Sequence, residues 1–191
     1  MKFTRCEIPD VILIEPKIHG DERGYFVETF REDKLSGFLG YKINFCQDNE
    51  SKSKKGVLRG LHYQLPPFAQ TKLVRVIKGK VLDVAVDIRK GSPTFGKYVA
   101  VELSEQNKKQ LLVPRGFAHG FVVLEDDTIF AYKVDSYYSP ECDKGIAFDD
   151  ESIGVDWILP KEELILSNKD KVQPKLNETN NLFEYWINYY E

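Results

Sequence analysis

The side chains of this sequence best suited to acid–base chemistry are its three histidines, His19, His62 and His119. An imidazole changes charge near neutral pH, and it is also a common ligand of transition metals. Each histidine is therefore a candidate for proton transfer or for metal binding. For His62 taken alone, a structural histidine held by hydrogen bonds is an equally good interpretation.

The surroundings of His119 point to a particular type of barrel. His119 follows Pro114 and Gly116 in a Pro-x-Gly-x-x-His pattern, which resembles the second sequence motif of the cupin superfamily, small β-barrels of jelly-roll topology. Metal-binding cupins have His-x-His in their first motif, whereas here Gln64 stands two residues after His62. Zinc and transition-metal sites usually have three or four protein ligands, so two imidazoles and an amide are a poor set. We therefore expect a barrel whose pocket holds no metal.

Lys72 and Tyr132 are polar side chains in otherwise apolar strand patterns. Tyr132 alternates with Phe130 and Val134, and Lys72 shares its alternation with Val74. Side chains two positions apart in a strand point to the same face, so both polar groups are predicted to face the apolar interior. The competing interpretations are a core tyrosine with a satisfied hydroxyl and a solvated surface lysine.

The composition is that of a globular protein rich in aromatic residues. A chain of 191 residues is enough for one well-filled domain and too short for two. It has 12 Phe and 10 Tyr but a single Met, which favours strands over a helical bundle. The 27 basic and 30 acidic side chains give a net charge of −3. That balance gives no basis for binding nucleic acid or an anionic membrane.

The sequence also bears on the cellular compartment. No apolar run approaches the ~20 residues that a membrane span requires, and Glu7 and Asp10 fall where a signal peptide needs an uninterrupted apolar segment. Cys6, Cys46 and Cys142 are odd in number and form no Cys-x-x-Cys pair. We therefore expect a cytoplasmic protein with unpaired, structural thiols.

Short apolar segments separated by turn residues predict a mainly β fold. With no long helices between them, they favour a sandwich or barrel. Together with the resemblance to the cupin motif, this implies a cupin-type jelly-roll barrel with short peripheral helices. The predicted strands are Leu73–Ile77, Val81–Ile88, Tyr98–Leu103, Gln110–Val113, His119–Leu124 and Thr128–Val134.

Two segments have helical spacing instead. Glu32–Leu39 predicts a short helix, and Leu182–Tyr190 predicts an amphipathic one. We therefore expect a single domain over residues 1–175 and a helical C-terminal extension over residues 176–191. We expect this extension to dock on its own chain rather than on a partner subunit.

Several longer motifs resemble those of the nucleotide-sugar epimerases typified by dTDP-4-dehydrorhamnose 3,5-epimerase. They occur in the same order from about residue 8 to residue 170, and together they are highly specific. The motifs are Gly20–Gly24, Gln47–His62, Thr71–Arg75, Asp87–Gly96, Gly116–Phe121 and Tyr137–Pro140.

The resemblance implies an isomerase acting on a hexose with a ketone at C4 and thymidine diphosphate at C1. The ketone acidifies the protons on C3 and C5, so a base, an enolate stabiliser and an acid on the opposite face can invert both centres. The implied reaction converts dTDP-4-dehydro-6-deoxy-D-glucose to dTDP-4-dehydro-L-rhamnose, in dTDP-L-rhamnose biosynthesis. It needs no cofactor because the ketone is already present, and the sequence contains no GxGxxG fingerprint.

The resemblance assigns four catalytic roles. His62 is implied to be the general base, and Asp170 is implied to fix its tautomer and stabilise the imidazolium. Asp83 is the alternative partner if Asp170 proves distant. Lys72 is implied to hold the enolate oxygen, and Tyr132 is implied to deliver the proton from the opposite face.

The resemblance also implies the substrate-binding residues. Arg23 and Arg59 suit a diphosphate because a guanidinium can bond two oxygens at once, and Lys169 adds a further cation. On the nucleotide side of the site the implied residues are Phe26, Glu28, Gln47 and Asn49, and Asp48 beside them is also implied to bind substrate. At the sugar end the implied residues are His119 and Tyr138.

Family members are typically homodimers that exchange N-terminal strands. By that analogy Arg23, Phe26 or Glu28 is expected to serve the site of the other subunit. The segment Glu141–Gly145 varies in length, so Asp143 is only a candidate contact. The aromatic extension over residues 176–191 is not explained by the resemblance.

Four alternatives stay open at the level of the sequence. The enzyme could epimerise a single carbon or a differently substituted nucleotide sugar, which pocket shape decides. A 3,4-ketoisomerase would not need Tyr132 as an acid. A non-catalytic sugar-nucleotide-binding cupin would tolerate His62→Ala without losing affinity. A metal-dependent cupin dioxygenase or isomerase would lose activity in chelator.

Overall fold

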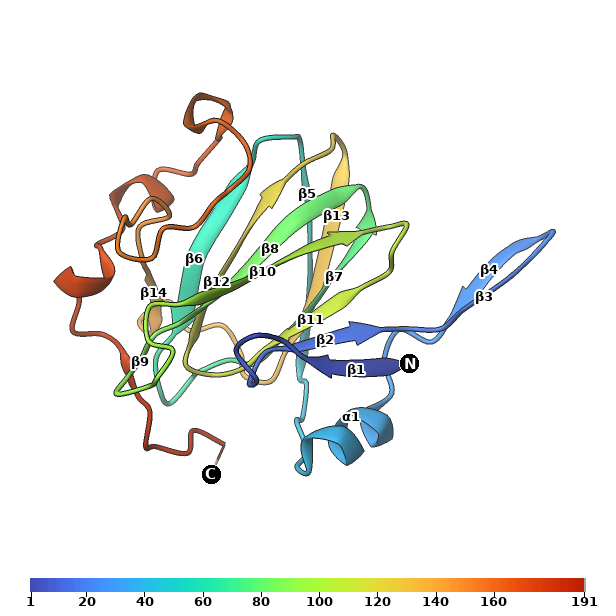
Figure 1. Cartoon of the computed structure of the whole chain (residues 1–191), viewed down its shortest axis with the longest axis horizontal. Helices are drawn as coiled ribbons and strands as arrows, with labels where there is room; N and C mark the ends of the chain where they lie inside the picture. The colour runs from blue at the N-terminus through green and yellow to red at the C-terminus, as the bar shows by residue number, and fades with distance from the viewer. Residues whose placement is uncertain (191) are drawn as a thin grey trace.

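The computed structural model describes residues 1–190 and shows two antiparallel sheets facing one another (Figure 1). In spatial order the six-stranded sheet comprises β1 (Lys2–Arg5), β2 (Ile12–Glu15), β11 (Gln110–Val113), β7 (Lys72–Lys78), β13 (Thr128–Val134) and β5 (Gln47–Ser53). The five-stranded sheet comprises β10 (Tyr98–Ser104), β8 (Lys80–Asp87), β12 (Phe117–Val123), β6 (Leu58–Gln64) and β14 (Asp143–Gly145).

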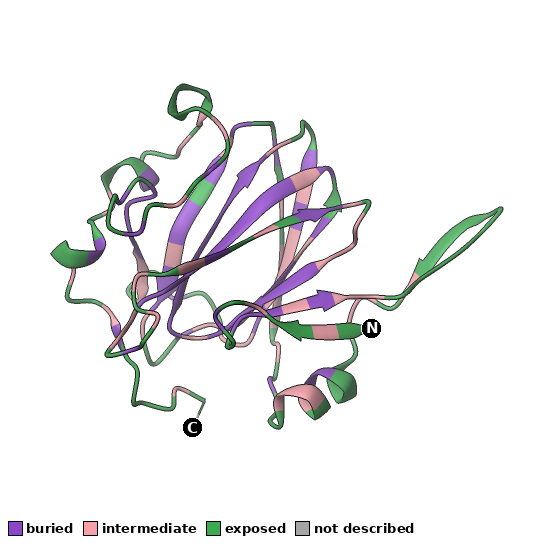
Figure 2. Cartoon of the chain, viewed as in Figure 1, coloured by how far each residue is buried: buried purple, intermediate pink, exposed green. Residues whose placement is uncertain are grey.

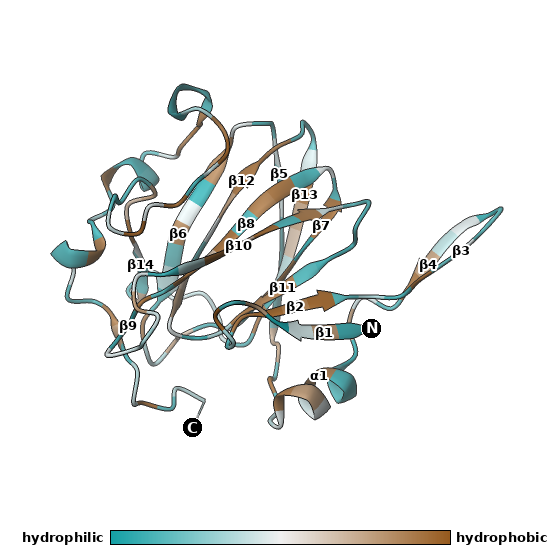
Figure 3. Cartoon of the chain, viewed as in Figure 1, coloured by the Kyte–Doolittle hydropathy of each residue, from teal (hydrophilic) through white to brown (hydrophobic). Residues whose placement is uncertain are grey.

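The core lies between the two sheets, where Figures 2 and 3 show buried and apolar residues along the strands. Val74 of β7 and Ala85 of β8 are both fully buried and belong to one apolar cluster that joins the sheets. The alternation of side chains along each strand explains this, because it sends every second residue inward. Phe130 and Val134 are buried as their spacing predicts. The mainly β prediction is confirmed, and each predicted strand matches an observed one to within two residues.

Helix α1 (Glu32–Leu39) has the predicted bounds. Glu32 and Asp33 place negative charge in its first turn, where it stabilises a helix. The helix ends at Gly40, whose φ of 84° is the left-handed conformation that a residue without a Cβ adopts at little cost. Leu35 is the side chain of this helix that is buried, against the outer side of the six-stranded sheet.

The predicted C-terminal helix over Leu182–Tyr190 is wrong. Instead Phe183–Glu184 form β15, which runs parallel to β9 (Arg89–Lys90). The helical parts of the extension and its approach are single 3₁₀ turns, namely η1 (Lys161–Glu163), η2 (Asp170–Val172) and η3 (Leu176–Glu178).

The aromatic residues of the extension face different partners, which explains why no helix forms. Phe183 is 1% exposed and packs on Tyr63 of β6, while Tyr190 packs on Tyr41 beside α1. A helix would gather these rings on one face and could not satisfy both contacts. The extension nevertheless packs on its own chain, as expected.

A hairpin of β3 (Ile18–Asp21) and β4 (Gly24–Val27) projects away from the body of the protein (Figure 1). Nearly all of its residues are exposed, including Tyr25 at 60% and Phe26 at 67%. Large exposed aromatic side chains on an extended arm are typical of a surface that another molecule covers.

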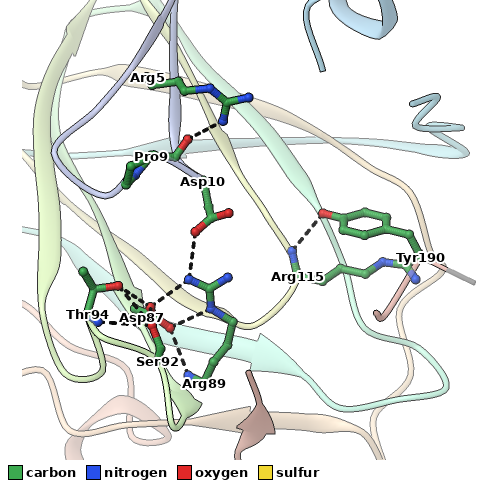
Figure 4. Close-up of polar contacts among 9 residues, drawn as sticks. All are labelled: Arg5, Pro9, Asp10, Asp87, Arg89, Ser92, Thr94, Arg115 and Tyr190. Atoms are coloured by element: carbon green, nitrogen blue, oxygen red, sulfur yellow. Dashed lines mark hydrogen bonds and ion pairs between the residues drawn. The ribbon is translucent and has the colours of Figure 1, made fainter. Parts of the chain in front are cut away.

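The turn after β8 is organised around a buried carboxylate (Figure 4). Asp87 is fully buried and accepts hydrogen bonds from the side chains of Arg89, Ser92 and Thr94. Arg89 also pairs with Asp10, so the N-terminal segment is tied to this turn. A buried charge with this many donors is a structural anchor.

Of the helices within residues 1–190, none has the length and apolar character needed to cross a membrane.

Candidate active site

A cavity of about 580 Å³ opens between the two sheets, and its lining includes the four side chains that the sequence predicts to be catalytic. His62 comes from β6 of the five-stranded sheet, whereas Lys72 of β7 and Tyr132 of β13 come from the six-stranded sheet. Asp170 enters from η2, beyond both sheets. The remaining lining residues are Asn49, Glu50, Ser51, Val57, Leu58, Arg59, His119, Phe121, Phe130, Ile165, Leu166 and Ser167.

His62 and Asp170 form a hydrogen-bonded pair. Nε2 of His62 lies 2.5 Å from Oδ1 of Asp170, whose side chain is 3% exposed. The other carboxylate oxygen accepts a 2.8 Å hydrogen bond from the Ser167 hydroxyl. Burial alone would raise the pKa of Asp170, but the hydrogen bonds from His62 and Ser167 outweigh it and hold the pKa below its usual value. The carboxylate is therefore ionised and fixes the orientation of the imidazole, while the other ring nitrogen is left for a ligand.

Lys72 is the first residue of β7 and places its amine in the cavity. Burial lowers the pKa of this amine to about 8, although the carboxylates of Asp143 and Asp83 act in the opposite direction. No hydrogen bond joins the amine to another side chain of residues 1–190. An ammonium in such a site interacts strongly with negative charge that develops on a ligand, because little water is present to screen it.

Tyr132 lies across the cavity from His62, on the opposite sheet. Burial raises the pKa of its phenol, with Arg59 opposing and Asp143 adding to the shift, so the phenol keeps its proton at neutral pH. Within the described chain its hydroxyl has no hydrogen-bond partner. A protonated phenol of this kind can donate to a ligand from the side opposite His62.

His119 forms a second buried pair, with Asp83. Nε2 of His119 lies 2.9 Å from Oδ2 of Asp83, which is fully buried. Asp83 is thus the partner of His119, and Asp170 is the carboxylate that reaches His62. Burial raises the pKa of Asp83, and the nearby His119 and Lys72 reduce that shift.

Arg59 carries positive charge to the rim of the same cavity. It precedes His62 by three residues on β6, and its Nη2 donates to the Ser53 hydroxyl at 3.2 Å. Phe121 and Phe130 stack at 4.0 Å on the apolar wall. The sequence placed Phe130 on the inward face with Tyr132, but neither Phe121 nor Phe130 was predicted to line the site.

Asp143 connects two predicted contact residues, Tyr138 and Lys169. The hydroxyl of Tyr138 donates to Oδ2 of Asp143 at 3.1 Å, and the Lys169 amine pairs with the same oxygen. Asp143 begins β14, which pairs with β6 so that Asp143 stands opposite Gln64. The variable segment thus brings a carboxylate near enough to Lys72 to raise the pKa of its amine, although Asp143 is not among the residues that line the cavity.

The polar residues of β5 divide between its two faces. Asn49 lines the cavity, and Gln47 donates to its side-chain oxygen at 2.8 Å. Asp48 points to the outer face and accepts from the Lys133 amine at 2.9 Å. A one-residue step along a strand reverses the side chain, so Asp48 is not in the cavity of its own chain.

Seven of the ten predicted substrate-binding residues are not among those that line the cavity, namely Arg23, Phe26, Glu28, Gln47, Asp48, Tyr138 and Lys169. Three of these lie on or beside the projecting hairpin. Arg23 and Phe26 belong to the projecting hairpin, and the guanidinium of Arg23 pairs with Asp21 beside it. Glu28 follows the hairpin and pairs with Arg31. None of the three is among the residues that line the cavity.

The residues 1–190 contain no group of three or more His, Cys, Asp and Glu side chains arranged to hold a metal ion.

Comparisons with known proteins find relatives along nearly the whole chain. Residues 5–178 match the family model described as dTDP-4-dehydrorhamnose 3,5-epimerase. The dTDP-4-dehydrorhamnose 3,5-epimerase of Shigella flexneri is 55% identical over 170 residues, which cover 89% of this chain and 93% of that protein.

Solved structures agree with these matches. The crystal structure of a dTDP-6-deoxy-D-glucose-3,5-epimerase from Legionella pneumophila, in complex with dTDP-4-keto-L-rhamnose, is 47% identical and has a TM-score of 0.93. The alignment covers 97% of this chain and 99% of that one. A 3'-monoepimerase from Streptomyces bikiniensis, in complex with dTDP-quinovose, is 32% identical with a TM-score of 0.88, covering 94% and 92% of the two chains. The predicted cupin-type fold is confirmed, with the difference that the two sheets do not join into one closed cylinder.

Proposed function

The chain belongs to the dTDP-4-dehydrorhamnose 3,5-epimerase family, and from that premise we propose that it inverts C3 and C5 of dTDP-4-dehydro-6-deoxy-D-glucose to give dTDP-4-dehydro-L-rhamnose. One observation carries the proposal. A paired imidazole and a protonated phenol face the same cavity from opposite sheets, with a buried ammonium beside them. Inversion of a carbon requires a base on one face and an acid on the other.

We propose that His62 removes the proton from the carbon next to the ketone. The C–H bonding electrons move into a C=C bond as the ketone becomes an enolate, and the proton resides on the imidazole. The ionised Asp170 stabilises the imidazolium that forms. The Lys72 ammonium lies where it can balance the charge on the enolate oxygen, a contribution of several kcal/mol in comparable sites.

The second half of the reaction belongs to Tyr132. Its phenol returns a proton to the opposite face of the enolate, so the carbon is inverted and the ketone forms again. After this step the imidazole has gained a proton and the phenol has lost one. Exchange with solvent restores both groups before the next step. The raised pKa of Tyr132 supports this role because the phenol must be protonated when the enolate forms.

We propose that Arg59 and Lys169 bind the diphosphate and that Gln47 and Asn49 contact the nucleoside. We propose that Tyr138 lies at the sugar end of the site, with His119. Arg59 lines the cavity, and Lys169 pairs with Asp143 and is near enough to affect the pKa of Lys72. Guanidinium and ammonium groups suit phosphate oxygens at such a rim.

We further propose a homodimer in which the β3–β4 hairpin reaches the neighbouring subunit. The hairpin projects from the body, and its exposed Phe26 and Arg23 cannot reach the cavity of their own chain in this arrangement (Figure 1). In the partner's site they would supply the aromatic face and the guanidinium that a thymidine diphosphate needs.

We also propose that the enzyme works in the cytoplasm. Cys6, Cys46 and Cys142 are all free thiols, as expected in a reducing compartment.

The test is incubation with dTDP-4-dehydro-6-deoxy-D-glucose in D₂O, with and without chelator, followed by mass spectrometry and proton NMR. We expect deuterium at both C3 and C5, and a product that a downstream reductase converts to the rhamnose nucleotide. Tight binding of the nucleotide without any exchange would contradict catalysis and leave a binding module. Activity that is lost in chelator would contradict the cofactor-independent reaction.

A single-carbon epimerase is the second candidate, because the Streptomyces bikiniensis 3'-monoepimerase has nearly the same fold. Deuterium at C3 alone in the same experiment would favour it.

A further inference from the structure

Four residues at the end of β7 form a closed ring of hydrogen bonds. The Tyr190 hydroxyl lies 2.9 Å from Oγ1 of Thr71 and accepts a 3.3 Å bond from the backbone N–H of Arg115. The backbone N–H of Thr71 donates to Oδ1 of Asp135 at 2.6 Å, and the Arg115 side chain donates to Oδ2 of the same carboxylate at 3.2 Å. Figure 4 shows two of its members, with the Tyr190 hydroxyl directed at the Arg115 nitrogen.

The ring is enclosed by protein on the side that faces the sheet. Thr71 is fully buried, and the side chain of Asp135 is 4% exposed. Tyr190 keeps 36% of its surface exposed, but its hydroxyl end is inside, and burial raises the pKa of the phenol well above its usual value. Its ring packs on Tyr41 at 5.1 Å and beneath the Arg115 guanidinium.

The position of the ring in the sheet relates it to the cavity. Thr71 immediately precedes Lys72, the residue that carries the cavity ammonium. Lys72 pairs with Val134 of β13 and with Val113 of β11. Asp135 directly follows Val134, and Arg115 follows Val113 by two residues. The ring therefore closes the ends of three adjacent strands at the level of Lys72.

Tyr190 reaches this place because the extension is anchored before it. Phe183 is buried against Tyr63, whose hydroxyl donates to the Asn181 carbonyl at 2.7 Å. The Tyr189 hydroxyl accepts from the Glu184 N–H at 2.8 Å, and the Tyr189 carbonyl accepts from Arg115. These contacts fix the chain on both sides of the last described turn, so Tyr190 is held on the ring.

We propose that Tyr190 is a positioning residue for the epimerase reaction, which holds the Thr71–Lys72 end of β7 so that the Lys72 ammonium faces the developing enolate and stays shielded from water. The inference rests on the proposed function for its catalytic consequence. The fixed position of the Lys72 amine and its shielding from water are argued from the hydrogen-bonded ring alone. A shift of about 1 Å in a charge that stabilises an intermediate lowers the rate by a large factor.

Three charged groups lie near the Lys72 amine and influence its pKa. Asp83 of β8 and Asp143 of β14 face the amine from the opposite sheet, and Lys169 before η2 adds positive charge. All three lie away from the ring, so a change at Tyr190 alters the burial of Lys72 without removing any of its charged neighbours.

The test compares Tyr190→Phe with Tyr185→Phe. Both substitutions remove one hydroxyl from the same extension, but Tyr185 packs over Arg89 and is not part of the ring. For Tyr190→Phe we expect kcat to fall roughly tenfold with KM changed less than twofold. For Tyr185→Phe we expect both constants to equal those of the wild type.

Direct titration of the Lys72 amine gives a readout that does not depend on turnover. In NMR of protein with isotope-labelled lysines, assigned by the signal missing in Lys72→Arg, water admitted to the site raises the pKa of the amine toward its ordinary 10.5. We expect a rise of at least about half a pH unit in Tyr190→Phe and none in Tyr185→Phe. An unchanged pKa in Tyr190→Phe would overturn the inference, whether or not the wild type is an epimerase.

Thr71→Val completes the test because it removes the partner of the Tyr190 hydroxyl. If the two groups act through one hydrogen bond, the double variant loses no more kcat than either single variant. Losses that multiply would overturn the inference, as would a lowered Tm with wild-type kcat. An inactive wild type whose Lys72 pKa still depends on Tyr190 would refute the proposed function alone.

Discussion

Nε2 of His62 lies 2.5 Å from Oδ1 of Asp170, although 108 residues separate the two along the chain. The second oxygen of the carboxylate is held by Ser167, and the side chain is 3% exposed. Of the two groups bonded to this carboxylate, the imidazole is the one that takes part in proton transfer in the proposed reaction. The pair therefore behaves as a unit, in which Asp170 determines what His62 can do.

The first prediction concerns this unit. Asp170→Asn keeps the shape but removes the charge that stabilises the imidazolium, so we expect kcat to fall by about 10²–10⁴. His62→Ala should abolish deuterium exchange while the Kd for thymidine diphosphate stays within about threefold, because the proposed role of His62 is at the sugar and not at the nucleotide. Calorimetry measures the Kd, and NMR in D₂O measures exchange. Exchange that survives in His62→Ala would require a different base.

The second prediction separates proton removal from proton return. In Tyr132→Phe the base is intact, so solvent deuterium should still enter the substrate. Without the phenol the opposite face lacks its donor, and net inversion should fall by at least about 10². Mass spectrometry measures exchange, and coupling to the downstream reductase measures inversion. Wild-type inversion in Tyr132→Phe would contradict the assignment of the acid.

The third prediction is a pH dependence set by Lys72. The enolate is stabilised by the protonated amine, whose pKa burial lowers to about 8, so kcat/KM should fall as the pH rises through about 8. Asp143 raises the pKa of Lys72, so Asp143→Asn should move this alkaline limb to lower pH. Tyr132 does not account for the limb, because its pKa is raised from 10. A limb that stays in place in Lys72→Met would assign it to another group.

The fourth prediction concerns stability. Asp87→Asn removes the charge from a fully buried carboxylate bonded to Arg89, Ser92 and Thr94, so we expect a loss of about 3–5 kcal/mol in the free energy of unfolding. Asp149→Asn is the control, because its pair with Lys161 is exposed and worth less than about 1 kcal/mol. Urea unfolding at one protein concentration measures both. Equal losses would contradict the special role of Asp87.

The same carboxylate gives the acid dependence of stability a definite sign. Burial raises the pKa of Asp87, but the bonds from Arg89, Ser92 and Thr94 outweigh it, so the folded pKa lies below the ordinary 3.8. A depressed carboxyl pKa contributes stability above the unfolded value and loses it as the pH falls through the folded value. The wild type should therefore lose stability below about pH 4 more steeply than Asp87→Asn.

The sequence predicts the strands and helix α1 because both follow from the local periodicity of apolar residues, which the folded structure retains. Tyr132 and Lys72 were predicted to face inward for the same reason. The pairing of Asp83 with His119, and not with His62, depends on the register of β8 against β12, which sets His119 opposite Ala85. The residue pattern of one strand does not determine how that strand aligns with its neighbour.

The C-terminal extension shows the opposite case. The spacing of its apolar residues predicts a helix, but Phe183 and Tyr190 pack against separate parts of the folded protein. Tertiary contacts override a weak local preference in so short a segment. Asp48 was assigned to the site by motif alone, and its outward direction follows from strand alternation beside Asn49.

The last prediction tests the shared site of the proposed homodimer. Arg23 belongs to the projecting hairpin and His62 to the body, so in a strand-exchanged dimer the two serve one site from different chains. When Arg23→Ala and His62→Ala chains are mixed and reassembled, roughly half of the dimers are mixed, and each has one site with both native residues. About a quarter of wild-type activity should return, although each variant alone is nearly inactive. His62→Ala mixed with Asp170→Asn is the control, because both residues come from the same body and no mixed dimer holds a native site. Recovery in neither mixture, with mixed dimers verified by native mass spectrometry, would show that the hairpin does not complete the neighbour's site.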